Sequence, residues 1–93
     1  MIKSFGSNAT ARLFRRERVK QFEAFAQQAL RKMVMIHAAK SLNDLAAVPG
    51  NRLEKLRSDR KHQHSIRIND KWRVCFVWKE SDAHEVEFTD YHD

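Results

Sequence analysis

The sequence predicts an α+β domain: a small antiparallel β-sheet with N-terminal helices packed on one of its faces. Two patterns carry this prediction. Apolar residues recur at helical spacing in the first half of the chain, and they alternate with polar residues in three segments of the second half. The 93 residues suit one domain with a modest core, expected to span residues 1–93. Hydrophobic residues make up 42% of the chain, with two Gly and one Pro, which argues for a folded chain.

The first half predicts a short strand followed by helices. The strand candidate covers residues 2–5, and Ser7 or Asn8 can cap a brief helix that runs through Phe14. Between residue 21 and about residue 37, one apolar stripe predicts a longer helix with a single buried face. The stripe consists of Phe22, Phe25, Ala26, Ala29, Leu30, Met33 and Ile36 or His37. Ser41 and Asp44 have capping-box spacing, and the Pro-Gly-Asn sequence at residues 49–51 then turns the chain.

Three alternating segments in the second half predict an antiparallel meander. They cover residues 66–68, 72–78 and 84–88, after a short basic element around Leu53 and Leu56. A three-residue loop after Ile68 keeps the apolar residues of the first two strands on one face, because it pairs Ile66 with Val74.

This register predicts what lies on the opposite, polar face of the sheet. Arg67 falls opposite Arg73, and pairing Trp78 with His84 in the next hairpin places Arg73 opposite Thr89. Tyr91 is then expected beside the two arginines, with Asp90 and His92 at the edge. Adjacent like charges destabilise a bare sheet, so we expect an anion to bind between the arginines.

The charge is uneven and favours a polyanionic or acidic partner. Residues 1–50 carry +6, residues 51–73 carry +5 and residues 74–93 carry −5, for a total of +6. Nucleic acid is the leading candidate partner, followed by an acidic protein. No segment is as apolar as a membrane span or a signal core. The single cysteine, Cys75, fits a reducing cytoplasm.

The basic segment and the Asp-Tyr-His sequence at residues 90–92 together suit phosphodiester chemistry. RNA can be cut without metal when its 2′-hydroxyl attacks the neighbouring phosphate, given a base, an acid and cations for the phosphate charge. Arg57 and Arg73 are the candidate phosphate ligands, since guanidinium groups match two phosphate oxygens. His92 and Asp90 are candidates for proton transfer. The aromatic ring at position 91 can stack a base.

Ordinary structural roles compete with several of these assignments. Exposed arginines on strands are usually just solvated, and Asp90 could simply pair with Arg73. Trp72 and Trp78 are predicted to be core anchors. Cys75 is expected to be a small buried filler. The two histidines at positions 62 and 64 lack a Cys or acidic partner at ligand spacing, so we predict no metal and no cofactor.

The same residues resemble the HigB toxins of the RelE superfamily over nearly the whole chain. The resemblance rests on the segment 65–76, ending in Trp-Arg-Val-Cys-Phe, on the sequences at residues 51–53 and 59–60, on the terminal Asp-Tyr-His and on the opening Ile-Lys-Ser-Phe. It implies a bacterial toxin that cleaves mRNA on the translating 70S ribosome, with a small antiparallel sheet and helices on one side. It also implies a HigA-like helix-turn-helix antitoxin that neutralises the toxin and provides the contact with operator DNA.

Carried over by position, the resemblance selects a specific set of site residues. The catalytic set is Arg57, Arg73, Asp90 and His92, with Tyr91 as an RNA-binding residue. The basic residues Arg67, Arg60 and Lys61 are further RNA-binding candidates on their charge and position rather than through the resemblance. The chain departs from the family at Glu54, where a histidine is common, and at Arg57, where a lysine is common. Glu54 is therefore a possible base. Two other functions stay open: a basic RNA-binding module, and an interaction module with weakened catalysis that binds an antitoxin without cutting mRNA.

Overall fold

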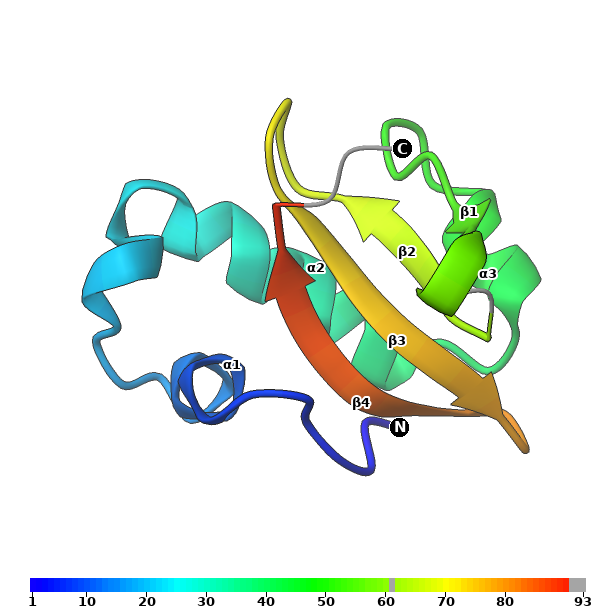
Figure 1. The fold of residues 1–93 in the computed structure, drawn as a ribbon, viewed down its shortest axis with the longest axis horizontal. Helices are drawn as coiled ribbons and strands as arrows, with labels where there is room; N and C mark the ends of the chain where they lie inside the picture. Colours follow the sequence, from blue (N-terminus) through cyan, green and yellow to red (C-terminus); the bar gives the residue numbers. More distant parts are fainter. Residues whose placement is uncertain (61, 91–93) are drawn as a thin grey trace.

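The computed structural model describes residues 1–60 and 62–90 and confirms the predicted α+β class. The elements are α1 Asn8–Phe14, η1 Lys20–Phe25, α2 Ala26–Ala38, α3 Leu42–Ala46, β1 Glu54–Lys55, η2 Ser58–Arg60, β2 His64–Arg67, β3 Arg73–Lys79 and β4 Asp82–Thr89. The four strands form one antiparallel sheet in the order β1-β2-β3-β4. Figure 1 shows α2 crossing behind this sheet. Within the described residues no helix is long and apolar enough to cross a membrane.

The predicted helix caps are present, but the long helix begins later than predicted. Ser7 accepts a hydrogen bond from the Thr10 amide at the start of α1, and Ser41 forms a capping box with Asp44 at the start of α3. Residues 20–25 form the 3₁₀ helix η1, and α2 begins only at Ala26. The apolar spacing in the sequence does not distinguish a 3₁₀ helix from an α-helix, because a 3₁₀ helix also places residues i and i+3 on one side.

The core lies between α2 and the face of the sheet that α2 covers. Ala29, Met33 and Ile36 of α2 are fully buried, as are the strand residues that alternate with polar positions. Those strand residues are Ile66, Val74, Phe76 and Val86, with Phe88 nearly so. Trp72 and Trp78 pack against this core as predicted.

Phe22 of η1 joins the helices to the sheet through its aromatic neighbours. Its ring centroid lies 4.8 Å from that of Phe88 and 5.8 Å from that of Trp72, both near perpendicular. Trp72 also stacks on Phe25 at 5.2 Å. The η1 turn therefore closes one end of the core.

The predicted register is confirmed for β2 and β3 and wrong in part for β4. Arg67 pairs with Arg73, and Arg73 with Thr89, as expected. However, Trp78 pairs with Ala83 rather than with His84, because a β-bulge between Cys75 and Val77 shifts the register. Glu85 has a φ of +54° at this irregularity. The extra residue moves His84 off the apolar face, and Ala83 is buried there instead.

The predicted first strand is present only as two isolated parallel bridges to β4. Ile2 bridges to Ala83 and Phe5 to Val86. Gly6 ends this segment close to β4, where a Cβ atom would lie 3.0 Å from the Glu85 carbonyl oxygen. A side chain at position 6 would therefore push the segment away from the sheet.

Candidate functional site

The register places a set of polar side chains on the face of the sheet that points away from α2, which we call the polar face. Directly opposed residues of antiparallel strands point to the same side of a sheet. One row consists of Glu54, Ser65, Cys75 and Glu87, and the next of Arg67, Arg73 and Thr89. Carboxylates, hydroxyls and guanidinium groups thus share one surface.

Arg73 is held near the middle of the polar face by neutral hydrogen-bond acceptors. Its Nε donates to the Ser65 hydroxyl at 2.7 Å, and its Nη2 donates to the Arg52 carbonyl oxygen at 2.5 Å. A longer bond of 3.3 Å joins Nη2 to the Ser65 carbonyl. These contacts fix the guanidinium without neutralising its charge, so it remains able to attract an anion.

The carbonyl that orients Arg73 is itself positioned by a buried asparagine. Asn51 is fully buried, receives a hydrogen bond from the Lys32 amine at 2.5 Å and donates to the Leu45 carbonyl at 3.0 Å. The next residue, Arg52, has a φ of +46°. The turn after α3 is thereby anchored to α2, and its backbone reaches the polar face.

Arg60 approaches the polar face from η2 and reaches across the sheet. Its Nη1 donates to the Gln63 side chain at 3.0 Å and lies 3.8 Å from a carboxylate oxygen of Glu87 on β4. Both side chains of the ion pair are about one-third exposed. Its energetic contribution is therefore small, but it shows that the Arg60 side chain extends from η2 towards β4.

Cys75 lies beneath these charges and is inert as a nucleophile. Its side chain is fully buried, and burial raises the pKa of the thiol to about 11, against the opposing effects of Arg60 and Arg73. The expectation of a small buried filler is therefore confirmed.

Because the Cys75 thiol is buried, we expect the stability of the protein to depend on pH in the alkaline range. Because the folded state holds this proton more tightly than the unfolded chain, the free energy of unfolding should fall as the pH rises from 9 towards 11. The native protein should also resist a thiol-specific reagent at pH 8. Urea titrations across this pH range on wild type and Cys75→Ala check this, and an equal slope in both proteins would contradict it.

The remaining predicted residues lie at the margins of the polar face. Arg57 is exposed just before η2. Arg67 pairs with Asp70 at 2.5 Å, and Asp90 lies 3.7 Å from the amine of Lys71 instead of pairing with Arg73. Glu54 is exposed on β1, opposite Ser65. Three predicted residues, Lys61, Tyr91 and His92, lie outside the described part of the chain.

The structure adds site residues that sequence reasoning missed. They are Ser65, the Arg52 carbonyl, Gln63 and Glu87, all in contact with Arg73 or Arg60. Ser65 and Glu87 could have been predicted as site residues from the strand register, because the register places both on the polar face. Nothing in the sequence gave the positive φ at Arg52. Over residues 1–60 and 62–90, no cluster of three metal-binding side chains is present.

Fold and site together define a small α+β protein with helices on one face of a sheet and arginines on the other. The family comparison agrees: residues 3–92 match the model described as the RelE-like toxin of type II toxin–antitoxin system HigB. The chain belongs to this family of toxins.

Two individual relatives match this chain over shorter stretches. Toxin HigB-1 of Vibrio cholerae serotype O1 is 42% identical over 48 residues, or 52% of this chain and 50% of that protein. An uncharacterized protein of Haemophilus influenzae is 32% identical over 56 residues, covering 60% of this chain and 55% of its own length. The chain thus spans about half the length of these curated relatives.

Two solved structures share the fold. A heterotetrameric YoeB-YefM toxin–antitoxin complex from Staphylococcus aureus matches with a TM-score of 0.62 at 18% identity, covering 100% of this chain and 99% of that chain. A second YoeB-YefM complex from the same organism matches with a TM-score of 0.57 at 16% identity and the same coverage. At these identities the likeness concerns the fold alone.

Proposed function

We propose that this toxin is a ribosome-dependent endoribonuclease that cuts translated mRNA in the bacterial cytoplasm. The observation that carries the proposal is the orientation of Arg73, whose guanidinium is held on the polar face by neutral acceptors and keeps its charge. Arg60 and Arg67 flank it. Such a preorganised group suits a phosphate whose negative charge grows in the transition state. Membership of a toxin family supports the assignment.

In the proposed reaction the 2′-hydroxyl attacks the adjacent phosphorus while the 5′-oxygen leaves. Arg73 and Arg57 stabilise the phosphate charge, Asp90 or Glu54 accepts the hydroxyl proton, and His92 protonates the leaving oxygen. The atoms balance without water or metal, because the attacking hydroxyl and the leaving oxygen both belong to the RNA. Tyr91 stacks a base of the bound codon, and Lys61 contacts the backbone.

The first experiment induces the protein in growing bacteria and maps mRNA 5′ ends. New ends are expected inside translated regions, and they should vanish when the start codon of a reporter transcript is removed. His92→Ala is expected to produce no new ends. Cuts that persist in the untranslated reporter would overturn the ribosome requirement, and an absence of cuts by the folded wild type would overturn the nuclease proposal.

The same assay separates the two candidate bases. Glu54→Gln and Asp90→Asn each remove a carboxylate charge while keeping nearly the same shape. The substitution at the true base should reduce cutting at least tenfold, and the other should leave it within about twofold, since general base catalysis typically contributes 10²–10⁴-fold. Equal cutting by both variants would contradict a carboxylate base.

A second function is favoured by one observation, the acid at position 54. If a histidine is required there, the protein binds an antitoxin without cutting mRNA. The structural neighbours are toxin–antitoxin complexes, which supports a protein antitoxin as partner. We propose a HigA-like helix-turn-helix protein, which would also supply the operator contact. Co-purification with such a protein, together with unchanged mRNA 5′ ends, would establish this alternative.

A further inference from the structure

The hydrogen bonds of Arg73 decide which of its nitrogens is left for a ligand. Its Nε and Nη2 both donate to acceptors of the protein, at Ser65 and at the Arg52 carbonyl oxygen. Within residues 1–60 and 62–90 no acceptor binds Nη1. A guanidinium group is planar and rigid, so the acceptors that hold two of its nitrogens also fix the direction of the third.

One of these acceptors belongs to a turn and not to the sheet. Ser65 is a residue of β2 and is therefore fixed by strand pairing. The Arg52 carbonyl lies between α3 and β1, in a segment without regular structure. Arg52 has a φ of +46°, in the left-handed region that is unfavourable for a residue with a side chain. The position of this carbonyl must therefore be maintained by contacts of its neighbours.

Asn51, the residue before it, makes those contacts with both its backbone and its side chain. Its carbonyl oxygen accepts a hydrogen bond from the Arg67 amide at 2.7 Å, and its own amide donates to the Val48 carbonyl at 3.2 Å. Its side-chain Nδ2 donates to the Leu45 carbonyl at 3.0 Å, and its Oδ1 accepts from the Lys32 amine at 2.5 Å. Both ends of the buried amide are engaged, so the turn is tied to β2, α3 and α2 at once.

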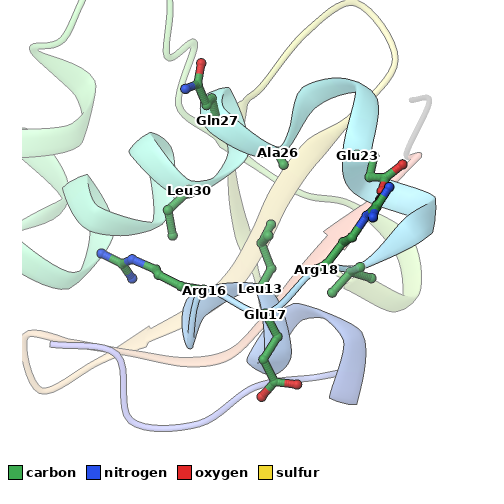
Figure 2. Close-up of a pocket in the computed structure, with 9 residues that line it drawn as sticks. Leu13, Arg16, Glu17, Arg18, Glu23, Ala26, Gln27 and Leu30 are labelled. Atoms are coloured by element: carbon green, nitrogen blue, oxygen red, sulfur yellow. Dashed lines mark hydrogen bonds and ion pairs between the residues drawn. The ribbon is translucent and has the colours of Figure 1, made fainter.

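The Lys32 amine reaches this turn from the side of α2 that faces Asn51. Figure 2 shows Leu30 pointing into a hollow between α1 and α2, and two residues along a helix correspond to a rotation of about 200°. Burial lowers the pKa of the Lys32 amine, and the charges of Arg31 and Arg67 lower it further. In the described part of the chain no carboxylate offsets this cost. The charge-assisted hydrogen bond to Asn51 is the contact that the amine makes there.

We infer that Asn51 is a positioning residue for Arg73, and that Lys32 holds Asn51 in place. Asn51 fixes the Arg52 carbonyl oxygen, so that the guanidinium presents Nη1 to the phosphate that is cut. The inference rests on the proposed function for the catalytic role of Arg73. The orientation of the guanidinium rests on the contacts alone and is tested separately.

The first measurement follows the Nε proton of Arg73 by NMR, in protein labelled with ¹⁵N-arginine. Lys32→Met removes the amine and keeps a side chain of similar length. Exchange of this proton with water should become at least about tenfold faster, because the guanidinium is no longer held. Arg31→Met, the same loss of charge at an exposed neighbour on α2, should change the exchange rate by less than about twofold. Unchanged exchange in Lys32→Met would overturn the inference.

The second measurement is the rate at which the purified protein cuts ribosome-bound mRNA, corrected for the folded fraction. Asn51→Ala and Lys32→Met should each lower the rate about tenfold or more, because small displacements of a catalytic group are costly. In an Arg73→Ala background, neither should lower the residual rate by more than about twofold, because a positioning residue acts through the arginine. An equal loss in both backgrounds would mean a purely structural role and would overturn the inference.

Two further results keep the inference separate from the nuclease proposal and from folding. If the folded wild type cuts no mRNA, the proposed function fails, while the exchange of the Arg73 proton still decides whether Asn51 orients the guanidinium. If Asn51→Ala does not fold, Lys32→Met decides both measurements, since Lys32 is only half-buried.

Discussion

Arg73→Ala is expected to lower the rate of mRNA cleavage by about 10²–10³-fold, the usual cost of removing one preorganised donor to a charged transition state. The guanidinium is held by Ser65 and by the Arg52 carbonyl, so no other side chain can take its place without moving the backbone. Arg73→Lys should restore only part of the activity, because an ammonium cannot hold two oxygens in a fixed plane. Mapping of mRNA 5′ ends and growth arrest provide the measurements.

Lys79→Ala is the matched control, since it removes a positive charge from the exposed end of the same strand. It should arrest growth like the wild type. Loss of Arg73 leaves the buried Ser65 hydroxyl unpaired, which costs about 1–3 kcal/mol of stability. The melting temperature must therefore be measured beside activity. A folded Arg73→Ala protein with full cutting activity would refute the proposed role of this arginine.

Phe22→Ala is expected to lower the free energy of unfolding by about 3–5 kcal/mol. Phe22 is 1% exposed and contacts the rings of Phe88, Trp72 and Phe25 at centroid distances of 4.8 to 5.8 Å. The cavity opens between η1 and the sheet, where three aromatic rings cannot easily collapse. Urea unfolding followed by tryptophan fluorescence measures the loss, and Trp72 reports directly on this region.

Gln21→Ala, one residue earlier in the same turn, should change stability by no more than about 0.5 kcal/mol. This control separates the loss of packing from any general effect on the 3₁₀ helix. A loss below 1 kcal/mol for Phe22→Ala would mean that η1 is only loosely attached to the core.

The sequence predicted what depends on local pattern and missed what depends on backbone irregularity. The pairing of Arg67 with Arg73 followed from requiring apolar residues on one face, and it is confirmed. The pairing of Trp78 with His84 failed because alternation cannot reveal a bulge. The helical stripe predicted which residues are buried but not the 3₁₀ geometry of residues 20–25.

In the candidate site, too, some features follow from the sequence pattern and others depend on backbone irregularity. Arginines on the polar face follow from the register, whereas the Arg52 carbonyl that orients Arg73 depends on a positive φ and on the buried Asn51. Likewise, the contact between Arg60 and Glu87 joins residues of η2 and β4, whose approach no periodicity could predict. The roles of Tyr91, His92 and Lys61 stay predictions.

The parallel bridges between residues 2–6 and β4 bear on how the chain matures during its own synthesis. The Ser4 hydroxyl accepts a hydrogen bond from the amide of Glu85 across 81 positions of sequence, so the opening segment cannot pair until β4 has been made. Until then, the pairing groups of residues 2–6 are exposed. Contacts of such long separation also slow folding. We therefore expect the docking of residues 2–6 on β4 to be a late step of folding, after the hairpin of β3 and β4 has formed.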